Sequence, residues 1–138
     1  MEADPNDASV DGNGAGARPV DTLQYATFEA MGAALEVDDL ELMASLVQMF
    51  LVDLADGRRV IVSATRINDA DAVQAAAHKL KSSARMLGAP ALGDLAEEIE
   101  AIARNGFTPD VDLLARFGAE CGRATEGMTL MKPFEVAS

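Results

Sequence analysis

Residues 69–88, DADAVQAAAHKLKSSARMLG, decide the fold. Successive residues of an α-helix advance by about 100°, and on that basis the apolar residues of this stretch fall on one face. Asp69 or Asp71 suits the start of the helix, and Gly88 is a typical stop signal after Leu87. The stretch therefore predicts an amphipathic helix that must bury one side against other helices. That side consists of Val73, Ala76, Ala77, Leu80, Ala84 and Leu87.

The same periodicity continues on both sides of this helix. A short helix is expected over residues 27–35, followed by a long one after a capping box of Asp38 and Glu41, ending at Asn68-Asp69. We expect Gly57 to bend or interrupt the long helix. Further helices are expected from Pro90 to Asn105 and from Asp110 to Met128, the last weakened by three glycines.

No strand pattern competes with these helices. The sequence predicts an all-α fold, an up-and-down antiparallel four-helix bundle with a short extra N-terminal helix. Residues 1–20 are rich in glycine, proline and aspartate and are expected to form a disordered tail, so the domain should cover residues 21–135.

The composition excludes several kinds of partner. A formal charge of −12 argues against nucleic acid and anionic membranes, because both need a cationic face. A single cysteine, Cys121, permits no internal disulfide and no zinc site with one histidine, and its helical position predicts a core residue. No apolar run is long enough to span a bilayer and no secretion signal is visible, so a cytoplasmic protein is expected.

His78 is the only histidine and should point away from the core. On the helical wheel it lies about 140° from Val73, and Lys81, Ser82 and Arg85 share its side. Between Asp71 and Asp94 the chain has three basic residues and no acidic one, which indicates a cationic surface suited to a phosphate. From the residues alone, a solvated helix face remains as good an interpretation as a functional site.

Residues 77–89, AHKLKSSARMLGA, resemble the phosphorylation motif of histidine-phosphotransfer (HPt) domains, approximately A-H-x-L-K-G-x-S-x-x-L-G-A. Leu92, Leu95 and Glu100 match the family's following L-x-x-L…L/I-E stretch, and residues 39–53 resemble its helix ending in F-L-x-D. The likeness extends over about residues 22–130. Two positions depart from the family pattern: Ser82 stands where the family has glycine, and Ala84 stands where it has serine. Ser82 puts in question the range of partners and the rate of phosphotransfer.

The resemblance implies a phosphorelay intermediate. His78 would accept a phosphoryl group at Nε2 from a receiver-domain phospho-aspartate and pass it to another receiver domain. Lys81 and Arg85 would steady its charge or assist docking, Ser82 could bond the phosphoryl oxygens, and Glu100 would accept the Nδ1 hydrogen bond unless it is merely an exposed charge.

The same resemblance implies the partners. They would be response-regulator receiver domains or a hybrid histidine kinase, meeting a monomer at a face of Gln74, Ala75, Lys81, Ser82 and Arg85 and neighbouring apolar positions. The chain would need no cofactor of its own, since the receiver supplies Mg²⁺.

Other functions fit the sequence less well. A non-catalytic helical adaptor that binds a signalling partner through the same face is the main alternative. A dimerising sensor-kinase domain would need a nucleotide loop, and no Gly-rich loop of that kind occurs, so a phosphohistidine carrier is expected rather than a stand-alone enzyme. A hydrolase triad lacks a serine or cysteine partner on the histidine's face.

Overall fold

The computed structural model describes residues 18–131, and within them the chain is helical with no β-strand, as predicted. The other residues, including most of the predicted tail and residues 132–135 of the predicted domain, lie outside this range. The first element begins at Pro19, two residues before the expected start of the domain. The elements are the 3-10 helix η2 (Pro19–Thr22) and the α-helices α2 (Phe28–Leu35), α3 (Leu40–Arg66), α4 (Ala70–Met86), α5 (Pro90–Arg104) and α6 (Val111–Leu130).

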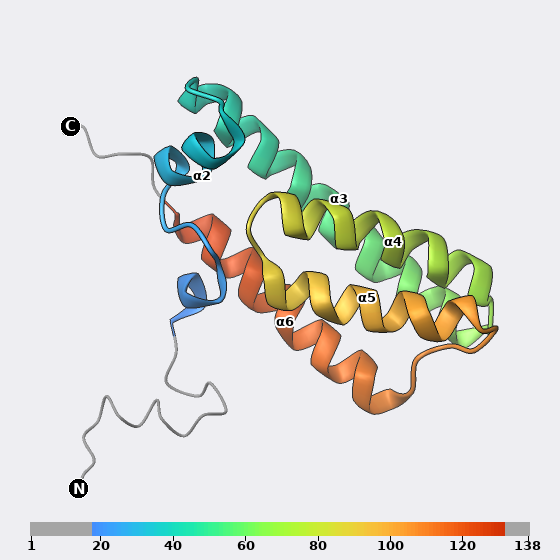
Figure 1. Ribbon diagram of the computed structural model, residues 1–138. Coiled ribbons are helices and arrows are strands. Elements are labelled where there is room, and N and C mark those ends of the chain that lie inside the picture. The colour runs from blue at the N-terminus through green and yellow to red at the C-terminus, as the bar shows by residue number, and fades with distance from the viewer. Residues whose placement is uncertain (1–17, 132–138) are drawn as a thin grey trace, which may run out of the picture.

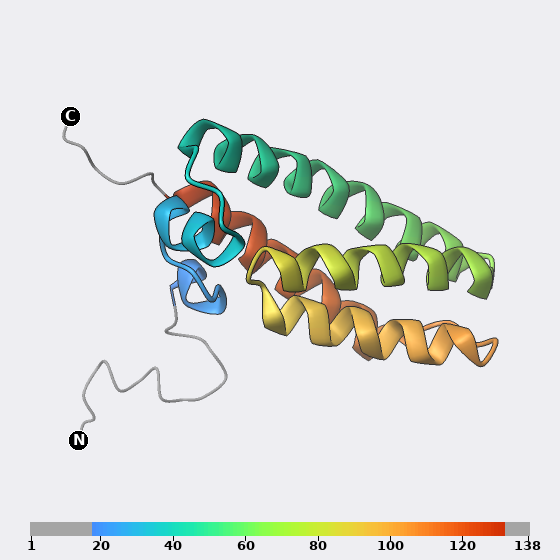
Figure 2. The same ribbon diagram turned by 45° about the horizontal axis from the view of Figure 1, so that its top comes forward.

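The four long helices α3–α6 lie side by side, and the chain reverses direction at each connection between them (Figures 1 and 2). Helix α4 packs on α3 and α5, and α6 packs on α5 and α3. Helix α2 and η2 lie together at one end of the molecule (Figure 1). The core between the helices is built from aliphatic side chains, methionines and alanines, with Phe28, Phe50 and Phe117 as aromatic members.

Helix boundaries follow from the capping residues. Asp69 caps α4 by accepting a hydrogen bond from the Ala72 amide, and Asp110 caps α6 in the same way. The capping box expected at Asp38 is wrong by one residue. Asp39 is the N-cap of α3, because its backbone is extended, as a cap requires, and its side chain accepts hydrogen bonds from the Glu41 and Leu42 amides.

Helix α3 passes through Gly57 without a break and runs for 27 residues. The expected interruption is therefore wrong. Gly57 costs the helix some propensity, but its neighbours Leu54 and Ile61 are buried in the core, and that packing keeps the helix continuous.

Gln24 and Tyr25, in the segment before α2, contact the turn between α4 and α5 at one end of the bundle. The Gln24 amide donates to the Gly88 carbonyl at 2.6 Å, and the Tyr25 ring lies so close to Gly88 that a side chain there would collide with it. Gly88 also has a positive φ of 85°, which ends α4 and turns the chain into α5. This end of the molecule thus has little room for larger side chains.

Candidate functional site

Helix α4 presents His78 to solvent. Val73, Ala77, Leu80 and Ala84 are buried along the opposite side of the helix, while the His78 side chain is 63% exposed. The predicted direction of the histidine is therefore confirmed. An imidazole held on a regular helix and open on one side is accessible to a second protein.

A buried carboxylate on the next helix holds the ring. Glu100 lies on the side of α5 that faces α4 and is only 4% exposed, so the alternative of a free surface charge is excluded. Its Oε2 atom is 2.7 Å from His78 Nδ1, and its Oε1 atom is 2.7 Å from Lys81 Nζ. Lys81 comes from the turn of α4 after His78, so one carboxylate joins both residues across the α4–α5 interface.

The charge of Glu100 fixes the tautomer of the ring. The hydrogen bond from Lys81 and, more weakly, that from His78 lower the pKa of Glu100, while its burial acts in the opposite direction. Glu100 is therefore a carboxylate near neutral pH and can only accept hydrogen bonds. A neutral His78 must then carry its proton on Nδ1, which leaves the lone pair of Nε2 on the exposed side.

A shallow hollow lies beside the ring. Its lining comes from α4 and α5 and includes Arg104, a residue that was not predicted from the sequence. Arg104 Nη2 is 3.4 Å from Glu100 Oε2, and its side chain is 57% exposed. The signal was its spacing, since residues four apart on a helix share a face and Arg104 follows Glu100 by four. The lining residues are Asp71, Gln74, Ala75, His78, Glu100 and Arg104.

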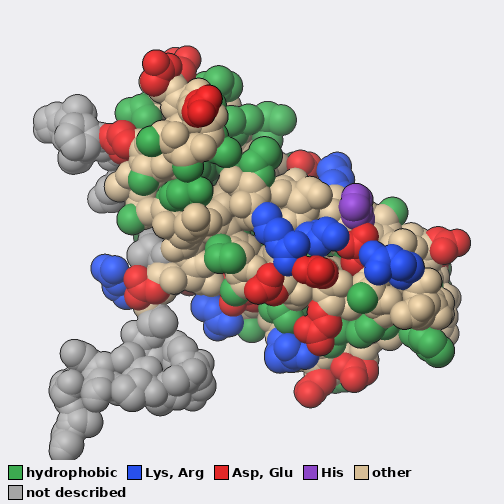
Figure 3. Space-filling model, in the orientation of Figure 1, with side chains coloured by type: hydrophobic (Ala, Val, Ile, Leu, Met, Phe, Trp, Pro, Cys, Tyr) green, Lys and Arg blue, Asp and Glu red, His purple; other side chains and the backbone are tan. Residues whose placement is uncertain are grey.

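Arg85 is directed to α5 and does not line this hollow. One guanidinium nitrogen is 2.8 Å from Asp94 and 2.5 Å from Glu97, and both ion pairs raise the pKa of Arg85. Gly93 makes room for the side chain, because a Cβ there would lie 2.7 Å from Arg85 Cγ. The acid-free stretch of sequence is therefore not acid-free in space, and Figure 3 shows acidic side chains interspersed with basic ones around the histidine.

Ser82 is exposed, one turn beyond His78 on α4, and its hydroxyl lies 3.4 Å from the His78 carbonyl oxygen. That weak contact turns the hydroxyl back toward its own helix. Of the other predicted docking residues, Ala75 is exposed and Gln74 is partly buried. The structure therefore brings His78, Lys81 and Glu100 together, and leaves Ser82 beside them without a contact to the ring.

Other reactive groups lie apart from this site. Cys121 is buried, which raises the pKa of its thiol to about 12, as expected of a core residue. Residues 18–131 contain no group of three or more histidine, cysteine, aspartate or glutamate side chains able to hold a metal ion. Over the same residues, no helix is both long and apolar enough to cross a membrane.

Comparison with protein-family models gives a match to the Hpt domain over residues 45–127, which covers most of α3 and all of α4 and α5, and continues into α6. The chain belongs to the Hpt domain family. Comparisons with curated proteins and with solved structures found no match. Hpt domains act in histidine phosphotransfer within phosphorelays, and they interact with receiver domains and histidine kinases.

Proposed function

We propose that this Hpt domain accepts a phosphoryl group on His78 from a receiver-domain phospho-aspartate and passes it to another receiver domain. The observation that carries the proposal is the pair of His78 and Glu100, in which a buried carboxylate 2.7 Å from Nδ1 leaves Nε2 free on the surface. A merely solvated histidine needs no such support from a neighbouring helix.

The proposed step conserves the proton on the ring. The Nε2 lone pair attacks phosphorus, the bond between phosphorus and the aspartyl oxygen breaks, and the receiver regains an aspartate carboxylate. The ring then carries a positive charge, because both nitrogens are substituted, and the adjacent Glu100 carboxylate balances that charge. In the reverse direction the N–P bond breaks and the same neutral tautomer returns.

Other charges near His78 would act on the phosphoryl oxygens. Lys81 and Arg104 both approach Glu100, the partner of His78, and Arg104 also lines the hollow beside the ring. Lys81 would hold Glu100 and steady the incoming negative charge, and Arg104 would add to it from the hollow. Arg85 would contribute to docking of the receiver, together with Asp94 and Glu97 of α5, with which it forms ion pairs. Mg²⁺ would be supplied by the receiver, which carries out most of the charge stabilisation.

We assign helices α3–α6 as an up-and-down antiparallel bundle whose α4 surface receives the partner. The docking face would include Gln74, Ala75, Lys81, Ser82 and Arg85, together with exposed apolar side chains of the neighbouring helix. A monomer suits this role, because each receiver must reach the same histidine in turn through a small and transient contact.

The test is phosphorylation by purified, phosphorylated receiver domains. The proposal expects a label on the full chain that is labile in acid and stable in base, and that is absent from His78→Ala. Lys79→Ala is the matched control, since Lys79 adjoins His78 but makes no ion pair among residues 18–131. Binding of receivers without any label, or a label that survives His78→Ala, would instead support the helical adaptor and exclude His78 as the acceptor.

A further inference from the structure

The seam between α3 and α4 exposes a row of apolar side chains. Met49 and Val52 on α3 are 61% and 59% exposed, and Met86 on α4 is 55% exposed. Shallow hollows lie along the seam between these residues. Exposed apolar side chains that gather in one place are typical of surfaces that bind another protein.

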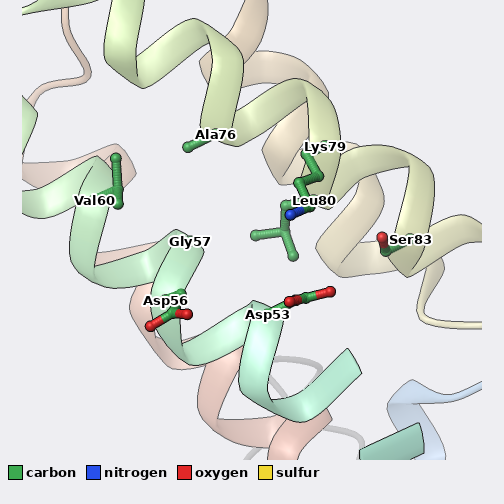
Figure 4. Close-up of a pocket in the computed structure, with 8 residues that line it drawn as sticks. All are labelled: Asp53, Asp56, Gly57, Val60, Ala76, Lys79, Leu80 and Ser83. Carbon is green, nitrogen blue, oxygen red and sulfur yellow. The ribbon is translucent and has the colours of Figure 1, made fainter. Parts of the chain in front are cut away.

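A further hollow continues the seam toward the middle of both helices (Figure 4). It exists because small residues face each other there: Gly57 on α3, and Ala76 and Ser83 on α4. A Cβ added to Gly57 would find its nearest neighbour, Leu80 Cδ2, 3.8 Å away, so the space is open. Lys79, the residue after His78 on α4, lines the same hollow.

Asp53 lies where these hollows meet, since it lines this hollow and both of the apolar ones. Its side chain is partly buried, and within residues 18–131 it makes no hydrogen bond and no ion pair, not even with Lys79. Asp56, one turn further along α3, is paired with Arg59 at 3.2 Å. Asp53 is thus a carboxylate without a counter-ion in the middle of an apolar seam.

We infer that Asp53 selects receiver partners by binding a lysine or arginine side chain set in an apolar surface. The aliphatic part of that side chain would lie over Gly57, Ala76 and Leu80, and its charged end would reach the carboxylate. The inference rests on the proposed function, because a receiver that reaches His78 would cover the adjoining seam.

The free-energy cost of burying the Asp53 carboxylate explains how it would select among receivers. A partner that buries an ionised carboxylate against apolar atoms must supply a cation or lose binding free energy. Receivers with a basic side chain at this point are favoured, and those with an acidic or apolar one are rejected. The formal charge of −12 also favours a basic partner surface during encounter.

The experiment uses the full chain after chemical phosphorylation with phosphoramidate, which requires no partner. Transfer to a panel of purified receiver domains is followed in single turnovers at increasing receiver concentration. Asp53→Asn is expected to raise the half-saturating concentration of the preferred receiver about tenfold, as the loss of a charged hydrogen bond does, and to leave the maximal rate unchanged. Asp56→Asn is the matched control, and thermal melting checks that both variants fold.

A charge exchange gives the sharper result. Asp53→Lys should transfer poorly to the preferred receiver and recover when one basic residue on that receiver is replaced by glutamate. Equal half-saturation for wild type, Asp53→Asn and Asp56→Asn would overturn the inference alone. Failure of every chain, wild type included, to transfer would overturn the proposed function as well. Dimerisation of wild type that Asp53→Asn abolishes would assign the seam to a second copy instead and overturn the inference.

Discussion

Glu100 on α5 and Glu120 on α6 are the two charged residues that the structure buries within residues 18–131, each with 4% of its surface exposed. Their partners differ. Glu100 is hydrogen-bonded to an exposed histidine and forms an ion pair with a lysine, and both residues lie on α4. Glu120 accepts one from the Thr22 hydroxyl of η2 and pairs with Arg123 on its own helix at 2.8 Å.

The surroundings of Glu120 explain its burial. Gly127, further along α6, allows the backbone of η2 to approach so closely that a Cβ would lie 2.8 Å from the Pro19 carbonyl oxygen. Glu120 therefore holds η2 against α6 through a hydrogen bond, and Gly127 permits the close contact because it has no side chain. Both partners of Glu120 are unreactive.

The comparison shows that a buried carboxylate does not by itself mark a functional site. Each one needs partners, because an isolated buried charge is costly. What distinguishes Glu100 is that its partner His78 has a second nitrogen facing solvent, so the hydrogen bond prepares a nucleophile. The hydrogen bond to Glu120 holds two segments of chain together. Mutations that separate these two roles test the comparison.

The largest effect is expected from Glu100→Ala on phosphotransfer. Without the carboxylate, Nδ1 loses its acceptor and the charge that develops on the ring loses its counter-ion, so the maximal rate should fall about a hundredfold. Glu100→Gln keeps an acceptor oxygen and should lose about tenfold or less. Single-turnover transfer to a receiver measures both rates. Equal rates in wild type and Glu100→Ala would remove Glu100 from the mechanism.

Glu120→Ala is expected to act on stability instead. Loss of the bonds to Thr22 and Arg123 should lower the free energy of unfolding by about 2 kcal/mol, measured by urea denaturation. The maximal rate of transfer should match wild type at a temperature where the variant remains folded. A slow but stable Glu120→Ala chain would contradict the division of roles between the two glutamates.

The sequence predicted the features that depend on one helix. The apolar stripe of α4 and the outward direction of His78 follow from helical periodicity, which needs no knowledge of other elements. Gly88 and Pro90 likewise marked the turn between α4 and α5. The position of Glu100 beside His78 was expected only through the family resemblance, since 22 residues separate the two in the chain.

Contacts between helices could not be read from one helix. The sequence between Asp71 and Asp94 contains three basic residues and no acidic one. In the structure, acidic side chains of α5 form ion pairs with two of these basic residues, Lys81 and Arg85. The Arg85 side chain can lie against α5 because Gly93 has no side chain there. The sequence pattern of α4 contains no sign of this contact. Arg104 lies four residues after Glu100 on the same helix, but that spacing acquires meaning only once Glu100 is known to lie beside His78.

Arg104 and Arg85 provide a smaller test of the Glu100 site. Arg104→Ala should lower the maximal rate of transfer about threefold, the effect of losing one exposed charge near the reacting group. Arg85→Ala should leave the maximal rate unchanged, because its guanidinium is held by Asp94 and Glu97. The same single-turnover assay compares them. A larger loss of maximal rate in Arg85→Ala would show that Arg85 leaves α5 when a receiver binds.

The smallest effect concerns how stability depends on pH. The pKa of Glu100 is lowered in the folded protein, so the ionised carboxylate stabilises the fold above its ordinary pKa of 4.5, and this contribution is lost as the pH falls through the lower folded pKa. Wild type should therefore exceed Glu100→Gln in unfolding free energy by about 1 kcal/mol at pH 7, and by progressively less below pH 4.5.

Urea denaturation at several pH values measures that difference, and subtraction removes the carboxylates that both chains share. Lys81→Met is the matched control, because it takes away the principal cause of the lowered pKa. In the Lys81→Met background, the stability difference that Glu100→Gln produces should fade at a higher pH than it does in wild type. A difference that stayed constant from pH 7 to pH 3 would mean that Glu100 stabilises the fold by packing, and its charge would then matter only to His78.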